Sequence, residues 1–293
     1  MLLFTRTRPE PYWRTLLILG RVSNLPTVWS NCLAGWLLGG GGTKEILVVL
    51  CLGATCLYIG GMFLNDAFDV EFDREYRAER PIPSGQIALD EVWRWGFGWL
   101  GFGTVILVLL GKTTGALTAP LVVCILLYDA VHKHVDLSPL LMAACRFFLY
   151  LVAASTAWNG VTGLAIWGAF ALAAYIVGLS YLARQESTRG TVNFWPCYLL
   201  IAPILLALLV NADAYRRSAL LISAILGLWI VRCVRHAFLV SDPNIGRAVG
   251  GLLAGIVLVD WLAVAGGGTL RASIAFALLF VVALLFQRFI PAT

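Results

Sequence analysis

Ten long apolar stretches constrain what this chain can fold into more than any other feature of its sequence. Crossing the hydrocarbon core of a membrane as a helix takes roughly 18–25 mostly apolar residues. Backbone groups in lipid must be hydrogen-bonded within their own segment, so we expect each stretch to be helical. The stretches are 13–39, 45–66, 92–111, 115–132, 138–158, 161–183, 193–211, 216–239, 247–266 and 270–289. This pattern predicts an all-α, polytopic membrane protein.

The composition of the chain excludes an ordinary soluble domain. Of its 293 residues, 60% are hydrophobic and 13% are charged, whereas soluble domains carry about 25% charged residues. The formal net charge of +5 comes from the connections between the spans, so we predict no nucleic-acid partner. We expect a single membrane domain over residues 1–293.

The positions of Lys and Arg predict the orientation of the chain. If the N-terminus is cytoplasmic, most of these side chains fall on the cytoplasmic side, Arg74, Arg77 and Arg94 among them. Short cytoplasmic loops carry such an excess of positive charge. We therefore expect an integral protein of a bacterial inner membrane whose residues 65–85 face the cytoplasm. The first stretch is too long and too polar for a signal-peptide core, so we expect it to be retained.

The densest charge cluster lies at the end of the second stretch. Asp66, Asp69 and Asp73 are spaced i, i+3 and i+7, which places them within roughly 60° on one face of a helix. Three carboxylates on one face repel each other unless a cation lies between them. Because Mg²⁺ is typically bound by one or two carboxylates together with substrate phosphates, the spacing favours a site for magnesium and a diphosphate. The alternative is a solvated acidic helix end.

Polar residues inside other apolar stretches indicate a chamber within the bundle. Arg21 and Asn24 share a face of the first stretch, and an ionisable residue within a span usually faces the bundle interior or a water-filled cavity. Alternatively, Arg21 extends to the cytoplasmic interface. Arg146, in the fifth stretch, is a buried cation that needs phosphate or an aspartate as its partner. Asp260, in the ninth stretch, is a functional candidate by its depth, without an assigned role.

Further candidates follow the fourth and sixth stretches. Lys133 is placed to neutralise a phosphate, and an ordinary positively charged helix end explains it equally well. Glu186 is the one acid in the connection after the sixth stretch. It either completes a second Mg²⁺ site or pairs with Arg184 or Arg189, which is the commoner fate of a surface acid.

The order and spacing of these residues resemble the UbiA superfamily of intramembrane prenyltransferases. The matching segments are residues 65–73 and 80–85 for the first Asp-rich motif, residues 21–27 for the first helix, and Tyr128, Lys133, Pro139, Cys145 and Arg146 for the fourth and fifth helices. The matches follow the order of the family and cover most of residues 14–190.

The resemblance implies a nine-helix bundle over a core of 13–266, here with an additional C-terminal helix at 270–289. It implies a prenyl diphosphate donor bound through Mg²⁺ in a cytoplasm-facing chamber, an unidentified acceptor, and membrane lipid around the bundle. The implied metal ligands are Asp66, Asp69, Asp73 and Glu186. The implied catalytic residues are Asp66, Asp69 and Lys133. The implied substrate-binding residues are Asn24, Asn65, Arg80, Tyr128, Arg146, Arg184 and Arg189.

One segment departs from the family pattern. The family's second motif carries several aspartates, whereas residues 184–190 contain Glu186 as their one acid, a variant that resembles the EboC-type branch. Our leading hypothesis is a Mg²⁺-dependent prenyltransferase acting on an aromatic or polyol acceptor. The alternative is a non-catalytic binding or export component for an isoprenoid metabolite. A CDP-alcohol phosphotransferase is disfavoured because the chain has no Asp-Gly pair before an Ala-Arg pair.

Overall fold

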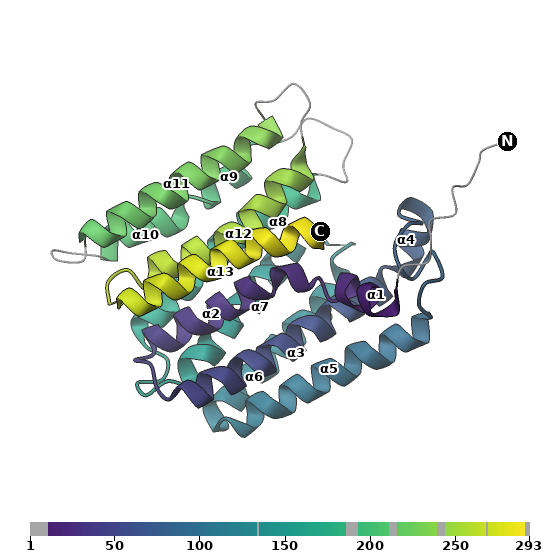
Figure 1. The fold of residues 1–293 in the computed structure, drawn as a ribbon, viewed down its shortest axis with the longest axis horizontal. Helices are drawn as coiled ribbons and strands as arrows, with labels where there is room; N and C mark the ends of the chain where they lie inside the picture. The colour runs from purple at the N-terminus through teal and green to yellow at the C-terminus, as the bar shows by residue number, and fades with distance from the viewer. Residues whose placement is uncertain are drawn as a thin grey trace.

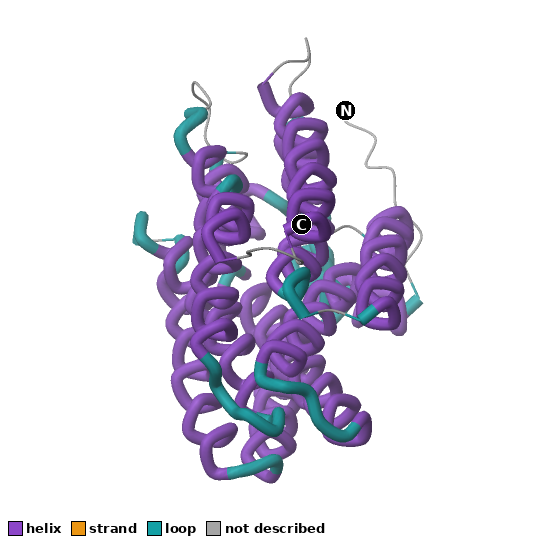
Figure 2. Tube along the Cα trace, turned by 90° about the vertical axis from the view of Figure 1, so that its left-hand side faces the viewer, coloured by secondary structure: helices purple, strands orange, loops and turns teal. Residues whose placement is uncertain are grey.

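The computed structural model describes residues 11–133, 135–185, 193–210, 216–238, 244–267 and 269–290, and in these residues every regular element is a helix. The long helices run side by side (Figure 1), and Figure 2 draws helices and loops throughout the described chain. The elements are α1 (Tyr12–Leu19), η1 (Val22–Asn24), α2 (Leu25–Leu38), α3 (Lys44–Phe68), α4 (Val70–Tyr76), α5 (Leu89–Leu109), α6 (Lys112–Val131), α7 (Ser138–Ser155), α8 (Gly163–Arg184), α9 (Pro196–Leu199), α10 (Ala202–Val210), α11 (Arg216–Phe238), α12 (Ile245–Ala263) and α13 (Leu270–Phe289). Of these described helices, 8 are long and apolar enough to cross a membrane. The chain is therefore an integral membrane protein, as its apolar stretches predicted.

Two of the predicted spans are not single helices. The stretch 13–39 divides into α1, the short 3-10 helix η1 and α2, because Arg21 adopts φ 41°, a left-handed conformation uncommon outside glycine. Pro26 lies in the first turn of α2, where its missing N–H costs nothing. Pro26 therefore does not interrupt α2. The stretch 193–211 likewise divides into α9 and α10.

Glycines bring α3 and α5 into close contact. A Cβ on Gly60 would lie 2.6 Å from the backbone nitrogen of Leu100, and a Cβ on Gly103 would lie 2.8 Å from the carbonyl oxygen of Gly53. In a membrane, where burial of apolar side chains between helices gains little, close packing at small residues drives helix association. This packing anchors α3, which carries the aspartate stretch at its C-terminal end.

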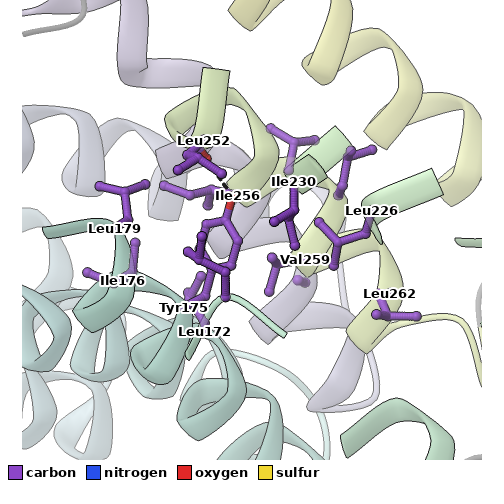
Figure 3. Close-up of a cluster of buried hydrophobic side chains, with 14 of the residues drawn as sticks. Leu172, Tyr175, Ile176, Leu179, Leu226, Ile230, Leu252, Ile256, Val259 and Leu262 are labelled. Carbon is purple, nitrogen blue, oxygen red and sulfur yellow. Dashed lines mark hydrogen bonds between the residues drawn. The ribbon is translucent and has the colours of Figure 1, made fainter. Parts of the chain in front are cut away.

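Two hydrophobic cores fill the bundle. The first lies among α8, α11, α12 and α13, and Figure 3 shows part of it around Tyr175 and Ile256. The hydroxyl of Tyr175 donates a hydrogen bond of 2.8 Å to the carbonyl oxygen of Leu252, which satisfies the polar atom of an otherwise apolar side chain. The second core lies among α2, α3, α5, α6 and α7 and includes Leu57 and Leu149.

A third, smaller cluster joins α1 and α4 to the end of α3, at the same end of the molecule in Figure 1. Leu19 of α1 packs there with Phe63 of α3, Val70 of α4 and Ile82 of the following loop. The cluster fixes the segment after α3 against the bundle. It therefore positions the three aspartates that the sequence singled out.

Candidate active site

A cavity of about 480 Å³ is lined by side chains from both large cores. Leu57 and Leu149 of the second core line it, as do Leu179 and Ile256 of the first. Most of its charged residues lie at the C-terminal ends of α3 and α6 and in the segments that follow them, and Arg21, Arg146 and Arg184 join the lining from before η1, from α7 and from the end of α8. A volume of this size is typical of small-molecule sites, roughly 300–1,000 Å³.

Two arginines bind two of the three aspartates. Nη2 of Arg21 donates to Oδ1 of Asp66 at 2.9 Å, and Nη1 of Arg80 donates to the same oxygen at 3.0 Å. Nη1 of Arg80 also lies 3.2 Å from Oδ2 of Asp73. All four side chains are mostly or wholly buried, where ion pairs are far less screened than at a surface.

In these ion pairs, the arginines rather than the aspartates line the cavity. Arg21 and Arg80 belong to the cavity lining, whereas Asp66 and Asp73 do not. The left-handed backbone at Arg21 accompanies its contact with Asp66, and such strain is typical of functional sites. Burial and the neighbouring aspartates raise the pKa of Asp73, although the charge of Arg80 opposes this shift.

The third aspartate binds cations that come from the end of α6. Asp69, at the junction of α3 and α4, has Oδ2 3.2 Å from Nζ of Lys133 and 3.3 Å from Nε2 of His132. Lys133 also lies 3.5 Å above the ring centre of Phe72. Burial raises the pKa of Asp69, but the hydrogen bond from His132 and the nearby charges outweigh burial and leave the pKa lowered. Burial lowers the pKa of Lys133, against the opposing charge of Asp69.

Asn65 connects the two walls of the charged end. Its Nδ2 donates to Oδ1 of Asp129 on α6 at 3.3 Å, and its Oδ1 accepts from Nη2 of Arg21 at 3.2 Å. Asp129 is buried, lines the cavity, and has Oδ2 without a partner among the described residues. Sequence reasoning assigned no role to Asp129 or His132. The sequence signal that could have found them is their position next to Tyr128 and Lys133 at the end of one apolar stretch.

Tyr128 and Asn24 also line the cavity, and their roles as substrate-binding residues stay predictions. The ring of Tyr128 stacks on His132 with ring centres 4.9 Å apart. Asn24 is the last residue of η1 and is buried. The break after Arg21 therefore brings both polar side chains of the first stretch to the cavity wall.

The donor set fits Mg²⁺ that is shared with a ligand. Among the described residues, no group of three or more His, Cys, Asp or Glu side chains is arranged to hold an ion by itself. Mg²⁺ normally takes one or two carboxylates and completes its octahedron with waters and substrate phosphates. Oδ1 of Asp73 and Oδ2 of Asp129 are buried acceptors without a partner. Asp69 is the carboxylate of the aspartate stretch that lines the cavity, whereas Asp66 and Asp73 are bound by Arg80 and would have to leave it to become metal ligands.

A second polar network lies deeper in the bundle. Nη1 of Arg146 donates to Oδ1 of Asn31 at 2.7 Å, and Nη2 donates to Oγ1 of Thr27 at 3.2 Å. Nδ2 of Asn31 donates in turn to Oδ2 of Asp260 at 2.7 Å, and that oxygen also accepts from Ser30 at 2.5 Å. Asp260 therefore belongs to a chain of hydrogen bonds that reaches the cavity at Arg146.

Arg184, at the end of α8, lines the cavity and is tied to the loop between α6 and α7. Its guanidinium donates to the carbonyl oxygens of Val135 and Asp136, to Oδ1 of Asp136 at 3.1 Å and to Oγ of Ser138 at 3.3 Å. Glu186 and Arg189 lie outside the described residues, so their predicted roles as metal ligand and substrate-binding residue stay predictions.

Fold and site together define an integral membrane protein with an internal cavity that is charged at one end and apolar beyond it. The profile of the UbiA prenyltransferase family matches residues 25–289, and the chain belongs to this family. The matched range includes α13, which we had expected to lie outside the common bundle.

Curated relatives match over shorter segments. A digeranylgeranylglyceryl phosphate synthase from Ignicoccus hospitalis is 30% identical over 150 residues, which are 50% of this chain and 49% of the relative. A synthase of the same name from Metallosphaera sedula is 38% identical over 69 residues, or 24% of each protein. The chain thus spans no more than about half the length of these curated relatives.

Solved structures resemble the whole fold. A UbiA homologue from Archaeoglobus fulgidus bound to GPP and Mg²⁺ aligns with a TM-score of 0.66, 14% identity, and coverage of 94% of this chain and 99% of that chain. A structure of digeranylgeranylglyceryl phosphate synthase in membranes aligns with a TM-score of 0.61, 19% identity, and coverage of 87% of this chain and 98% of that chain. At these identities the likeness establishes the fold.

Proposed function

We propose that this chain is a Mg²⁺-dependent intramembrane prenyltransferase, which transfers a prenyl group from a prenyl diphosphate to an aromatic or polyol acceptor. The observation that carries the proposal is the division of one cavity into a charged end, with Asp69, Arg80 and Lys133, and a remainder lined mainly by apolar side chains, apart from polar groups such as Asn24 and Arg146. A prenyl diphosphate likewise has a charged diphosphate group at one end and an apolar prenyl chain. The structural relative from Archaeoglobus fulgidus was solved with a ligand pair of this kind.

The charged end receives the diphosphate. Asp66, Asp69 and Asp73 would hold Mg²⁺, which when bound would supply positive charge to the leaving pyrophosphate. Arg80 now bonds Asp66 and Asp73, and it exchanges these partners for phosphate oxygens when the donor enters. Lys133 turns from Asp69 to the phosphate by the same exchange, since a lysine ammonium binds phosphate as a compact charge.

The reaction breaks the allylic carbon–oxygen bond of the donor, and pyrophosphate leaves with the bonding electrons. Arg80 and Lys133 stabilise the charge that develops on the leaving group, because fixed cations in a water-poor site act more strongly than in water. The face of Tyr128 on the cavity wall stabilises the allylic cation. The acceptor supplies an electron pair for the new bond and releases a proton.

The apolar part of the cavity receives the prenyl chain. Along α3, lining side chains run from Asn65 through Gly61 and Leu57 to Ala54, a distance of about 16 Å at the helical rise per residue. Asn24 and Arg146 line the wall across from α3. We assign these two residues to binding of substrate beside the chain, and Arg184 to the diphosphate at the cavity edge.

Orientation and membrane follow from the charges of the connections. Arg74, Arg77 and Arg94 lie near the charged end, so we place this end and the N-terminus on the cytoplasmic side of a bacterial inner membrane. The assignment to the EboC-type branch stays a prediction, as do the roles of Glu186 and Arg189.

The proposal is tested with the purified full-length protein in detergent. Labelled geranyl and geranylgeranyl diphosphate are offered with a panel of aromatic and polyol acceptors, with Mg²⁺ and with EDTA. We expect a labelled prenylated product that requires Mg²⁺ and that Asp66→Asn or Asp69→Asn lowers by at least about 100-fold.

Three outcomes separate the proposal from its alternative. Full activity in both aspartate variants contradicts the assigned site, and activity in EDTA contradicts the role of Mg²⁺. Tight binding of a non-hydrolysable donor analogue without turnover of any acceptor supports the binding or export component instead. Asp90→Asn, at the exposed start of α5, is the control for loss of a single surface charge.

A further inference from the structure

We infer that Asp129 of α6 is a ligand of the divalent cation at the charged end of the cavity, acting from a different helix than the aspartate stretch. The inference rests on the proposed function, because the ion is the one that binds the donor diphosphate. It assigns a carboxylate outside the aspartate stretch to the metal site.

The two oxygens of Asp129 have different surroundings. Oδ1 accepts a hydrogen bond from Nδ2 of Asn65 at 3.3 Å, whereas Oδ2 is buried without a hydrogen-bond partner among the described residues. The side chain is 3% exposed and belongs to the cavity lining. A buried carboxylate oxygen without a partner is costly, so an arriving cation gains from meeting it.

Protein cations near Asp129 are directed elsewhere. Nη2 of Arg21 lies against Asn65 and Asp66, and Nζ of Lys133 lies against Asp69. A purely structural role in orienting Asn65 explains only Oδ1. Oδ2 therefore has no protein partner among the described residues, and because the atom is buried, the carboxylate must turn toward the cavity for a cation to reach it.

The position of Asp129 also suits the sequence of this chain. The connection after α8 contains Glu186 as its one acid, so carboxylates beyond the aspartate stretch are scarce there. Asp129 lies on α6, bonded through Asn65 to the end of α3. With Asp69 on the cavity wall, it lets carboxylates from two walls bind one ion, and Mg²⁺ needs only one or two of them.

The first test measures metal binding directly. Mn²⁺, which replaces Mg²⁺ in oxygen sites and is visible by electron paramagnetic resonance, is titrated into the full-length protein with geranyl thiolodiphosphate. We expect Asp129→Asn to weaken Mn²⁺ binding by at least about 10-fold, because the amide keeps the size and the acceptor for Asn65 but loses the charge. Asp90→Asn should bind Mn²⁺ as the unaltered protein does.

A second variant distinguishes contact with the metal from support of Asn65. Asp129→Cys places a thiolate at the same position, and thiolates favour soft ions over Mg²⁺. We expect donor binding by this variant to be lost with Mg²⁺ and recovered with Cd²⁺, with no such preference in the unaltered protein. A residue that only orients Asn65 would not change the preferred metal.

The outcomes separate this inference from the proposed function. If Asp129→Asn binds Mn²⁺ normally while Asp69→Asn does not, the inference is wrong and the magnesium site stands on α3 and α4 alone. If the unaltered protein binds no Mn²⁺ with the donor analogue, the proposed function itself fails. If Asp129→Asn is not monodisperse, the metal preference of Asp129→Cys decides, and absence of Cd²⁺ recovery overturns the inference.

Discussion

Nζ of Lys133 lies 3.2 Å from Oδ2 of Asp69, so the cation that follows α6 is bound to the carboxylate between α3 and α4. The two residues are far apart in sequence, and their contact closes the charged end of the cavity between two helices. It also keeps the ammonium where a phosphate would meet it. Any ligand anion must therefore compete with Asp69 for Lys133, unless a metal ion takes the carboxylate first.

We predict that Lys133→Met lowers kcat/KM for the prenyl diphosphate by about 100-fold or more, because a fixed charge at the leaving group is removed. The rate of labelled product formation measures the effect. Lys112→Met is the matched control, since Lys112 is exposed at the opposite end of the same helix. Equal losses in the two variants would show that general electrostatics, rather than the position of Lys133, is responsible.

The pH dependence of kcat/KM should reflect the protonation of Lys133. Burial lowers the pKa of Lys133 below the 10.5 of an ordinary lysine, and only the protonated amine binds phosphate. We therefore expect kcat/KM to fall as the pH rises through this lowered pKa. Lys133→Arg keeps its proton over the range, so its falling limb should move to higher pH. Superimposable profiles for the two proteins would rule out titration of Lys133 as the cause.

Arg80 should be most important when no ligand is bound. Arg80→Met removes the cation of Asp73, while Asp66 keeps Arg21, and leaving a buried charge unpaired costs about 3 kcal/mol. We expect a lower melting temperature in detergent. Mg²⁺ should restore part of it, because an ion that binds only the folded state stabilises that state.

The unaltered protein and Arg94→Met, whose side chain is exposed on α5, should respond less to Mg²⁺. Arg94 lies on the same predicted side of the membrane, so it controls for loss of one positive charge. A melting temperature of Arg80→Met that is indifferent to Mg²⁺ would count against an ion at these carboxylates.

The sequence predicted the features that depend on local pattern. A span is specified by the length of its apolar run, so the stretches 45–66 and 138–158 correspond closely to α3 and α7. The spacing of Asp66, Asp69 and Asp73 indicated one face of a single helix, whereas the chain divides them between α3, the junction and α4. Asp66 and Asp73 share Arg80, and Asp69 lines the cavity.

Features set by contacts between distant segments were not predictable. The left-handed backbone of Arg21 goes with its bond to Asp66, which lies 45 positions along the chain. Sequence reasoning assigned no partner to Asp260, which accepts hydrogen bonds from Ser30 and Asn31 at the other end of the chain. No periodicity encodes such a pairing.

The network around Asp260 should stabilise the bundle and orient Arg146. Asp260→Leu leaves Nδ2 of Asn31 without its acceptor, while Ser30 keeps the carbonyl oxygen of Thr27, and this loss should lower the free energy of unfolding by about 2–3 kcal/mol. Loss of orientation at Arg146 should raise KM more than it lowers kcat. Thermal unfolding in detergent and steady-state kinetics measure the two effects.

A double-mutant cycle separates this network from simple overpacking. Asn31→Leu combined with Asp260→Leu should destabilise by less than the sum of the two single changes, with a coupling of about 0.5–3 kcal/mol. If the two losses of unfolding free energy simply add in the double variant, Asn31 and Asp260 do not depend on each other.

The apolar limit of the cavity predicts a preference for donor length. Ala54 lines the cavity about 16 Å along α3 from Asn65, and a larger side chain there should shorten the space for the prenyl chain. We expect Ala54→Phe to lower kcat/KM for geranylgeranyl diphosphate far more than for geranyl diphosphate. Val48→Phe is the control, because Val48 lies on the same helix and is 66% exposed. An equal loss for both donors, with the melting temperature unchanged, would place the end of the chain elsewhere.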